Sequence, residues 1–128
     1  MESIEIKFRG KCLDNWEWVY GYLADENYIN DINSIDLSSI EVDSETIGQF
    51  TGKKDKNGKG IYDGDVVEVN DKYGANRFRV IVKWHQQSMA FVAFKLSGKK
   101  RVPMSWFIDV LNNPEVIGNE FDNPELLK

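Results

Sequence analysis

The sequence predicts a small, mainly-β domain in which short antiparallel strands form a barrel or a sandwich. Apolar and polar residues alternate with a period of two in several segments, as in strands that bury one face. Gly, Asn and Asp residues separate these segments at short spacing, as in hairpin turns. The length of 128 residues and the hydrophobic content of 41% suit one domain with its own core. We therefore expect a single domain over residues 1–128.

The predicted strands follow one another along most of the chain. Ile4, Ile6 and Phe8 alternate with polar residues and indicate a first strand that stops at Gly10. Residues 25–45 are rich in Asp, Asn, Ser and Glu, and they predict an irregular insertion before a barrel core over about 46–120. The other strands are predicted near residues 16–23, 28–29, 40–42, 46–51, 66–69, 77–84, 89–96 and 115–119.

Two short helical segments are predicted in the last quarter of the chain. Pro103 suits the first turn of a helix, and Asn112-Asn113-Pro114 is a typical helix end. Between them, the apolar residues that recur at helical spacing are Met104, Phe107, Ile108 and Leu111. A second, shorter segment is predicted to hold Leu126 and Leu127, after the capping sequence Asp122-Asn123-Pro124.

The net charge of −5 conceals a strong asymmetry along the chain. Residues 1–50 carry three Lys or Arg against eleven Asp or Glu, a balance of −8. Residues 51–101 carry twelve against five, a balance of +7, and residues 102–128 carry one against five, a balance of −4. This layout indicates either an anionic partner for the basic middle or pairing between the basic and acidic segments of the chain itself.

The composition excludes several classes of protein. Cys12 is the single cysteine, so an intramolecular disulfide is impossible and a reducing compartment is favoured. No apolar run approaches the roughly 18 residues that cross a bilayer, and the polar, acidic Met1 to Glu5 is no secretory signal. We therefore expect a cytoplasmic protein without a membrane partner.

Two glycine-rich patterns resemble ligand-binding loops. Asp55 to Gly60 has an Asp, an Asn and a Gly at the spacing of a calcium loop. However, the fifth position is Lys59 and the twelfth is Val66, which are not oxygen ligands of the required kind. Gly52 to Lys59 is one residue too long for a phosphate-binding loop, and Gly60 stands where Ser or Thr is needed. A hairpin with Asn57-Gly58 at its tip is the favoured interpretation.

Catalytic and metal-binding chemistry has few candidates. His85 is the only histidine, and with Cys12 as the only cysteine a structural zinc site is excluded. Asp63 and Asp65 flank a glycine and form the most plausible carboxylate pair, with Glu68 nearby, but both are also ordinary turn residues. We expect no metal, no cofactor and no enzymatic activity.

An aromatic stripe is the first candidate contact surface. Trp16, Trp18, Tyr20 and Tyr22 occupy every second position of a predicted strand, so they share one face of it. The stripe is consistent with a core face, with a contact surface for a partner or a second copy, or with base stacking. Because the stripe lies in the acidic third of the chain, base stacking is the least favoured of the three.

The basic turns are the second candidate surface, for an anion or a nucleic acid. Lysine side chains at hairpin tips are usually solvated, but they can also bind phosphate groups. The residues concerned are Lys53, Lys54, Lys56, Lys59, Lys99, Lys100 and Arg101.

The central stretch Phe50 to Val67, with the sequence FTGKKDKNGKGIYDGDVV, resembles the YopX family. Glu5 to Gly10 resembles the opening of the family pattern, and Asn15 to Tyr22 resembles its second strand. Glu115 to Asn119, followed by Asn123 to Leu127, resembles its ending. The resemblance runs from end to end, with looser matches in residues 25–45 and 85–114.

The resemblance implies a small mainly-β protein with an SH3-like barrel or roll, extra N-terminal strands and one or two short helices. Proteins of this family are found in bacteriophages, prophages and their host genomes, so the resemblance implies a bacterial cytoplasm. The family's activity is not established, and no catalytic or ligand residue carries over. The shared Gly, Asp and Asn residues, with one packed Tyr62, are interpreted as turn and fold chemistry.

These observations together favour a phage or prophage accessory protein that acts as a non-enzymatic binding module through a protein partner or self-association. Weak, non-specific binding of nucleic acid through the basic middle segment is the alternative, and an enzyme using Asp63 and Asp65 ranks third.

Overall fold

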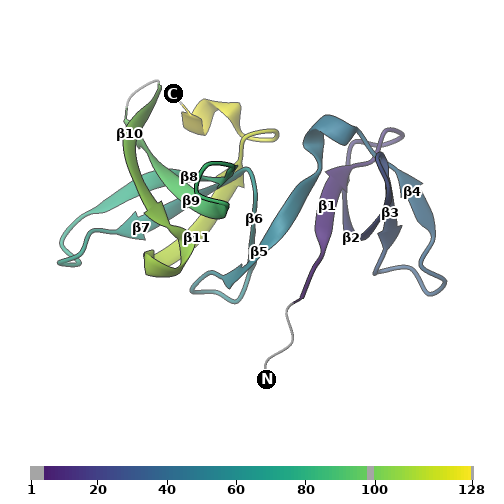
Figure 1. Cartoon of the computed structure of the whole chain (residues 1–128), viewed down its shortest axis with the longest axis horizontal. Coiled ribbons are helices and arrows are strands. Elements are labelled where there is room, and N and C mark those ends of the chain that lie inside the picture. The colour runs from purple at the N-terminus through teal and green to yellow at the C-terminus, as the bar shows by residue number, and fades with distance from the viewer. Residues whose placement is uncertain (1–4, 98–99, 128) are drawn as a thin grey trace. The chain divides into compact units, whose positions relative to one another are not determined.

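The computed structural model describes residues 5–97 and 100–127, without the side chains of residues 97, 100–106 and 109. Antiparallel strands dominate the described chain, which confirms the predicted mainly-β class. The chain divides into two compact units, Met1–Gly52 and Lys53–Lys128 (Figure 1). The charge asymmetry follows this division, because the first unit carries −8, and the second, with thirteen Lys or Arg against ten Asp or Glu, carries +3.

The first unit is a sheet of short strands in the order β4-β3-β2-β1-β5. The next strand in this order, beside β5, is β6. The elements of the first unit are β1 (Phe8–Lys11), β2 (Trp18–Asp25), β3 (Tyr28–Asp31), β4 (Ser39–Glu41), the 3-10 helix η1 (Ser44–Thr46) and β5 (Gly48–Lys54). The short strands predicted near 28–29 and 40–42 are therefore confirmed. Both pair into the sheet of the first unit, as β3 and β4.

One face of this sheet carries the hydrophobic cluster of the first unit. Cys12, Val19, Ile29 and Val42 form it, and Phe8, Ile40 and Ile47 pack against it. Gly10 pairs with Val19 across β1 and β2, and Ile29 pairs with Ile40 across β3 and β4, so these residues share that face. Ile29 and Val42 are almost fully buried, so this small cluster is what the sheet packs around.

Side-chain hydrogen bonds cap the helix η1 and connect it to β1. Asp43 is the N-cap residue, and its carboxylate accepts a hydrogen bond from the Glu45 amide at 3.0 Å. The buried Thr46 hydroxyl donates to the Asp43 carbonyl at 2.6 Å and accepts from the Lys11 amide at 2.8 Å. The polar groups at this helix end thus find partners inside the unit.

The second unit contains a five-stranded antiparallel sheet in the order β10-β9-β8-β7-β11. Its elements are β6 (Gly60–Tyr62), β7 (Asp65–Asn70), β8 (Arg77–His85), β9 (Ala90–Ser97), β10 (Lys100–Phe107), the 3-10 helix η2 (Ile108–Val110), β11 (Asn112–Asn119) and the 3-10 helix η3 (Pro124–Leu127). The predicted strands near 66–69, 77–84, 89–96 and 115–119 are confirmed, and so is the short C-terminal helical segment.

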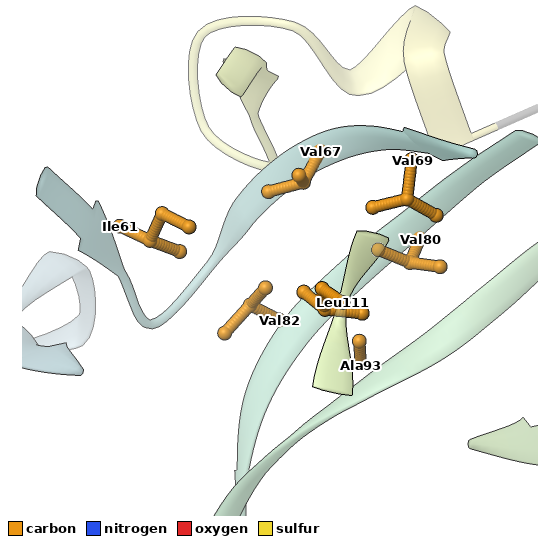
Figure 2. Close-up of a cluster of buried hydrophobic side chains, with 7 residues drawn as sticks. All are labelled: Ile61, Val67, Val69, Val80, Val82, Ala93 and Leu111. Carbon is orange, nitrogen blue, oxygen red and sulfur yellow. The ribbon is translucent and has the colours of Figure 1, made fainter. Parts of the chain in front are cut away.

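Alternating residues of β7, β8 and β9 supply the core of the second unit (Figure 2). Val67 pairs with Val80, and Val82 pairs with Ala93, so these side chains meet on one face of the sheet. The complete cluster consists of Ile61, Val67, Val69, Val80, Val82, Ala93 and Leu111. Its members are small and mostly β-branched, which suits close packing between strands.

The helix predicted from Pro103 to Leu111 is wrong. Residues 100–107 form strand β10, which pairs with β9, and only Ile108–Val110 form a helical turn. The register of β10 shifts between Arg101 and Ser105. Pro103 lies within this irregular stretch, where the hydrogen bond that proline cannot donate is not needed. Ile108 and Leu111, three residues apart, reach the core through the 3-10 turn, which explains part of the apparent helical spacing.

Among the described strands, the first and last strands of each sheet do not pair with each other, so both sheets are open. In the described part of the chain, no helix has the length and apolar character that crossing a membrane requires.

Burial in the first unit can be tested with two isoleucines. Ile29→Ala should lower the free energy of unfolding by about 2–5 kcal/mol, because Ile29 is fully buried and its truncation leaves a cavity. Ile35→Ala is the matched control, since Ile35 is fully exposed, and it should change stability by less than about 0.5 kcal/mol. Urea denaturation followed by circular dichroism measures both, and equal effects would contradict the described core.

Candidate functional site

Three members of the aromatic stripe, Trp18, Tyr20 and Tyr22, lie on the face of β2 that points away from the hydrophobic cluster. Val19 belongs to the cluster, and in a strand its neighbours Trp18 and Tyr20 point to the opposite side. Trp18 and Tyr20 are half-buried, whereas Trp16 and Tyr22 are exposed to 47% and 51%. The stripe is thus separate from the apolar cluster of its own unit.

Two cations of β1 lie against this stripe. Arg9 pairs with Tyr20 and Lys11 pairs with Trp18 across the β1–β2 ladder, so their side chains share one face. The Arg9 guanidinium carbon lies 4.3 Å from the centre of the Trp18 ring, and the Lys11 ammonium lies 4.7 Å from it. These are cation–π distances, worth about 0.5–2 kcal/mol each. The sequence analysis missed this pairing, although the alternation of Lys7, Arg9 and Lys11 opposite the aromatic strand was a usable signal.

Trp16 lies before the strand, in the turn that joins β1 to β2. The strand begins at Trp18, two residues later than the aromatic pattern predicts. Trp16 has a φ of 59°, in the left-handed region that bulky residues rarely adopt. Its amide donates to the Cys12 carbonyl at 2.8 Å, and its carbonyl accepts from the Lys11 ammonium at 3.1 Å. The ring is therefore held at a hairpin tip and half exposed.

The lysine-rich hairpin between β5 and β6 is confirmed as a surface turn. Lys54, Lys56 and Lys59 are exposed, and Lys53 is half-buried. The left-handed residue at the tip is Gly58, with a φ of 83°. Lys56 lies 3.6 Å from the Glu115 carboxylate, so part of this charge is matched by β11. Lys99 falls outside the described residues, as do the side chains of Lys100 and Arg101.

Asp55 anchors this hairpin and is itself buried, with 7% of its surface exposed. One carboxylate oxygen accepts hydrogen bonds from the amides of Asn57 and Lys59, both at 2.9 Å. The other oxygen accepts from the Val116 amide of β11, also at 2.9 Å. One aspartate thus closes its own turn and joins that turn to a strand 61 residues away in sequence.

The same turn occurs a second time between β7 and β8. Asp55-Lys56-Asn57-Gly58-Lys59 and Asp71-Lys72-Tyr73-Gly74-Ala75 share an Asp-Lys-x-Gly pattern, which the sequence analysis did not single out. In the second turn the Asp71 carboxylate accepts from the amides of Tyr73 and Ala75, and Gly74 has a φ of 74°. The repeated pattern is therefore turn chemistry with a physical basis.

The hydrogen bonds of these turns also shift the titration of their aspartates. Burial by itself would raise the pKa of Asp55, but the amides of Val116, Lys59 and Asn57 together hold this pKa below its ordinary value. The pKa of Asp71 is lowered in the same way, against the effect of burial, by the amide of Ala75 and by Asn76 and Tyr73. Both carboxylates are therefore ionised at neutral pH.

The carboxylates proposed for catalysis take part in turns and ion pairs. Asp65 is almost fully buried and accepts a hydrogen bond from the Tyr62 amide at 2.8 Å. Asp63 accepts from the Trp84 amide at 3.2 Å and lies 3.8 Å from the Lys83 ammonium. Glu68 is a further member of the set and forms a 2.9 Å ion pair with Arg77.

The two remaining candidates for catalysis or metal binding are Cys12 and His85, which have different surroundings. Cys12 packs in the hydrophobic cluster of the first unit, and a His85 ring nitrogen lies 2.7 Å from the Ser88 hydroxyl at the end of β8. In the described part of the chain, no group of three or more His, Cys, Asp or Glu side chains is placed to hold a metal ion.

The geometry defines a small mainly-β protein with two antiparallel sheets, an aromatic–cationic face and polar Asp-Gly turns. The family model described as "YopX protein" matches residues 7–128, and the chain belongs to the YopX family. The crystal structure of protein EF1440 from Enterococcus faecalis is similar, with 27% sequence identity and a TM-score of 0.57. That alignment covers 98% of this chain and 100% of that chain. No match was found among the curated proteins.

The role of Asp55 predicts a pH dependence of stability. Because the pKa of folded Asp55 lies below its ordinary value of 3.8, the ionised carboxylate stabilises the fold above that value. This stability should be lost as the pH falls below 3.8 towards the lower folded pKa. Asp55→Asn should be less stable than the wild type at pH 7, and the difference should shrink in acid.

Urea denaturation between about pH 2.5 and 7 measures this difference, because this range includes the ordinary pKa of 3.8. Asp36→Asn is a suitable control, because the Asp36 pKa is also lowered but its hydroxyl partners Ser34 and Ser38 lie in the exposed turn before β4. A pH-independent difference for Asp55→Asn would contradict the assignment.

Proposed function

We propose that this protein is a non-enzymatic binding module, an accessory protein of a phage or prophage, whose contact surface is centred on Trp16 and Tyr22. Membership of the YopX family supports the phage or prophage context. The observation that carries the proposal is the aromatic stripe, which faces away from the apolar cluster of its unit and leaves these two rings half exposed.

The backbone at Trp16 adds a second argument. A left-handed conformation costs a bulky residue roughly 1–2 kcal/mol, a cost that glycine would not incur. The Trp16 ring is 47% exposed, and the Lys11 ammonium lies 5.9 Å from its centre. Strain of this kind at an exposed aromatic residue is typical of a site that contacts another molecule.

The distribution of exposed apolar side chains favours a second copy of the chain as the partner. Eight of the thirteen large exposed apolar side chains among the described residues lie in the first unit, although it holds the smaller part of the chain. The eight are Ile6, Leu13, Trp16, Tyr22, Leu23, Ile32, Ile35 and Leu37. Contacts between identical subunits are more apolar than transient contacts, so this concentration suits self-association.

Trp16→Gly separates an interface role from a structural one. The variant should stay folded, because glycine relieves the positive φ, and it should weaken self-association by roughly 30-fold, as expected for a tryptophan at an interface centre. Light scattering over a wide concentration range, after size-exclusion chromatography, measures the shift from dimer to monomer.

Trp84→Ala is the matched control for this experiment, because Trp84 is 43% exposed and lies in the second unit. It should leave the oligomeric state unchanged. A wild-type protein that stays monomeric at about 1 mM, where even weak association becomes visible, would refute self-association.

Weak nucleic-acid binding is the second candidate function, and the exposed lysines of the β5–β6 hairpin favour it. Replacing Lys54, Lys56 and Lys59 by Gln should weaken binding to DNA of any sequence. It should also reduce the dependence of log affinity on log salt by about 2–3 units, because fewer counterions are released. Fluorescence anisotropy at several salt concentrations measures this, and binding that is sequence-selective and insensitive to salt would contradict it.

A further inference from the structure

A pocket of about 610 Å³ opens at one end of the second unit's sheet. It lies between the end of β7, the β7–β8 turn, the start of β8, β9 and the η2–β11 segment. The volume falls in the usual range for small-molecule sites, roughly 300–1,000 Å³. No function discussed above uses this pocket.

The apolar wall of the pocket is the edge of the hydrophobic core. Val69 and Leu111 are core residues (Figure 2). Phe78 packs against the same cluster. Val110 adds an apolar side chain that is 60% exposed. These residues form an apolar surface suited to a flat apolar group.

Lys95 lies beside these apolar residues, on the face of the sheet that carries the core. Lys95 pairs directly with Val80, which is fully buried, so its side chain leaves the sheet on the face that carries the core. At a strand position of this kind an apolar residue is the rule. The Lys95 ammonium lies 5.1 Å from the centre of the Phe78 ring, and both residues line the pocket.

The positive charge in the pocket is only partly matched. Arg77 is neutralised by Glu68, with an ion pair of 2.9 Å, and it also bonds to the Asn70 side chain. Within the described ranges, by contrast, neither Lys72 nor Lys95 forms an ion pair or a hydrogen bond. The Asp71 carboxylate, which also lines the pocket, is engaged by the amides of its own turn.

From this combination we infer that the pocket binds a small anion with a flat apolar body. The anionic group lies between Lys72 and Lys95, where it gains charge-assisted hydrogen bonds. The flat body packs on Phe78, Val110 and Leu111, where it leaves water. A nucleoside monophosphate and an aromatic carboxylate both have this chemistry, and the inference is independent of self-association through Trp16.

Amide NMR spectra recorded during titration with four probes test the inference. Adenosine monophosphate and naphthoate combine a flat body with an anionic group, whereas adenosine lacks the charge and inorganic phosphate lacks the body. The first two, or one of them, should shift the amides of residues 69–78, 95 and 110–112 with a dissociation constant below about 1 mM. Adenosine and phosphate should bind at least about tenfold more weakly.

Lys95→Met removes the ammonium but keeps an unbranched apolar side chain, so it should leave the fold intact and weaken binding about tenfold or more. Arg79→Met is the matched control, because Arg79 is an exposed cation of β8 next to Val80, on the opposite face of the sheet from Lys95, and lies outside the pocket. It should bind the probes as the wild type does. Repeating the titration on Trp16→Gly should give the same affinities, which separates this site from the proposed interface.

Each outcome decides the question. Binding of adenosine monophosphate alone identifies a nucleotide site, and binding of both aromatic anions identifies a less selective site of the same chemistry. The inference is overturned if neither adenosine monophosphate nor naphthoate shifts the pocket amides at about 10 mM. This concentration is well above the expected dissociation constant. It is also overturned if Lys95→Met binds as tightly as the wild type or if phosphate alone binds as tightly as the aromatic anions.

Discussion

The alternation of side chains along the strands is the constraint on which the rest of this structure depends. Among the described residues, each unit has a small apolar cluster that is supplied mainly by one face of its strands. The other residues of the same strands must then point away from the apolar cluster. In the first unit this places Trp18 and Tyr20 opposite Val19, beside the cations of β1. The aromatic–cationic face is thus a direct consequence of where the apolar cluster lies.

The second unit shows the same constraint at its limit. The core face of β8 and β9 is filled by Val80, Val82 and Ala93, all fully buried. One pair further along, Lys95 stands on that face where the apolar cluster ends. Beyond this point along β8 and β9, the apolar face meets solvent. An ammonium beside Phe78 is compatible with this position because its chain can follow the apolar wall while its charge remains accessible.

Turn chemistry joins the strands without adding to the core. Asp55 and Asp71 each accept two amide hydrogen bonds within a turn whose glycine has a positive φ. Asp55 also accepts the Val116 amide, so its turn is attached to β11. Amide donors stabilise the ionised carboxylate, and the lowered pKa of the buried Asp55 and of the half-buried Asp71 has this cause. Asp55, which the sequence pattern offers as a calcium ligand, thus closes a turn and joins it to β11.

The sequence by itself determined the mainly-β class, the glycine turn at Gly58 and most strands with a clear period of two, because these depend on neighbouring residues. The first of these strands was misplaced, because residues 5–7 precede β1, which runs through Gly10 to Lys11. It could not determine the state of residues 103–111, where pairing with β9 overrides an apparent helical spacing. It also could not place Arg9 against Trp18, or Lys95, Phe78 and Leu111 around one pocket. Those arrangements depend on strand register and on contacts between residues far apart in sequence, which only the tertiary structure decides.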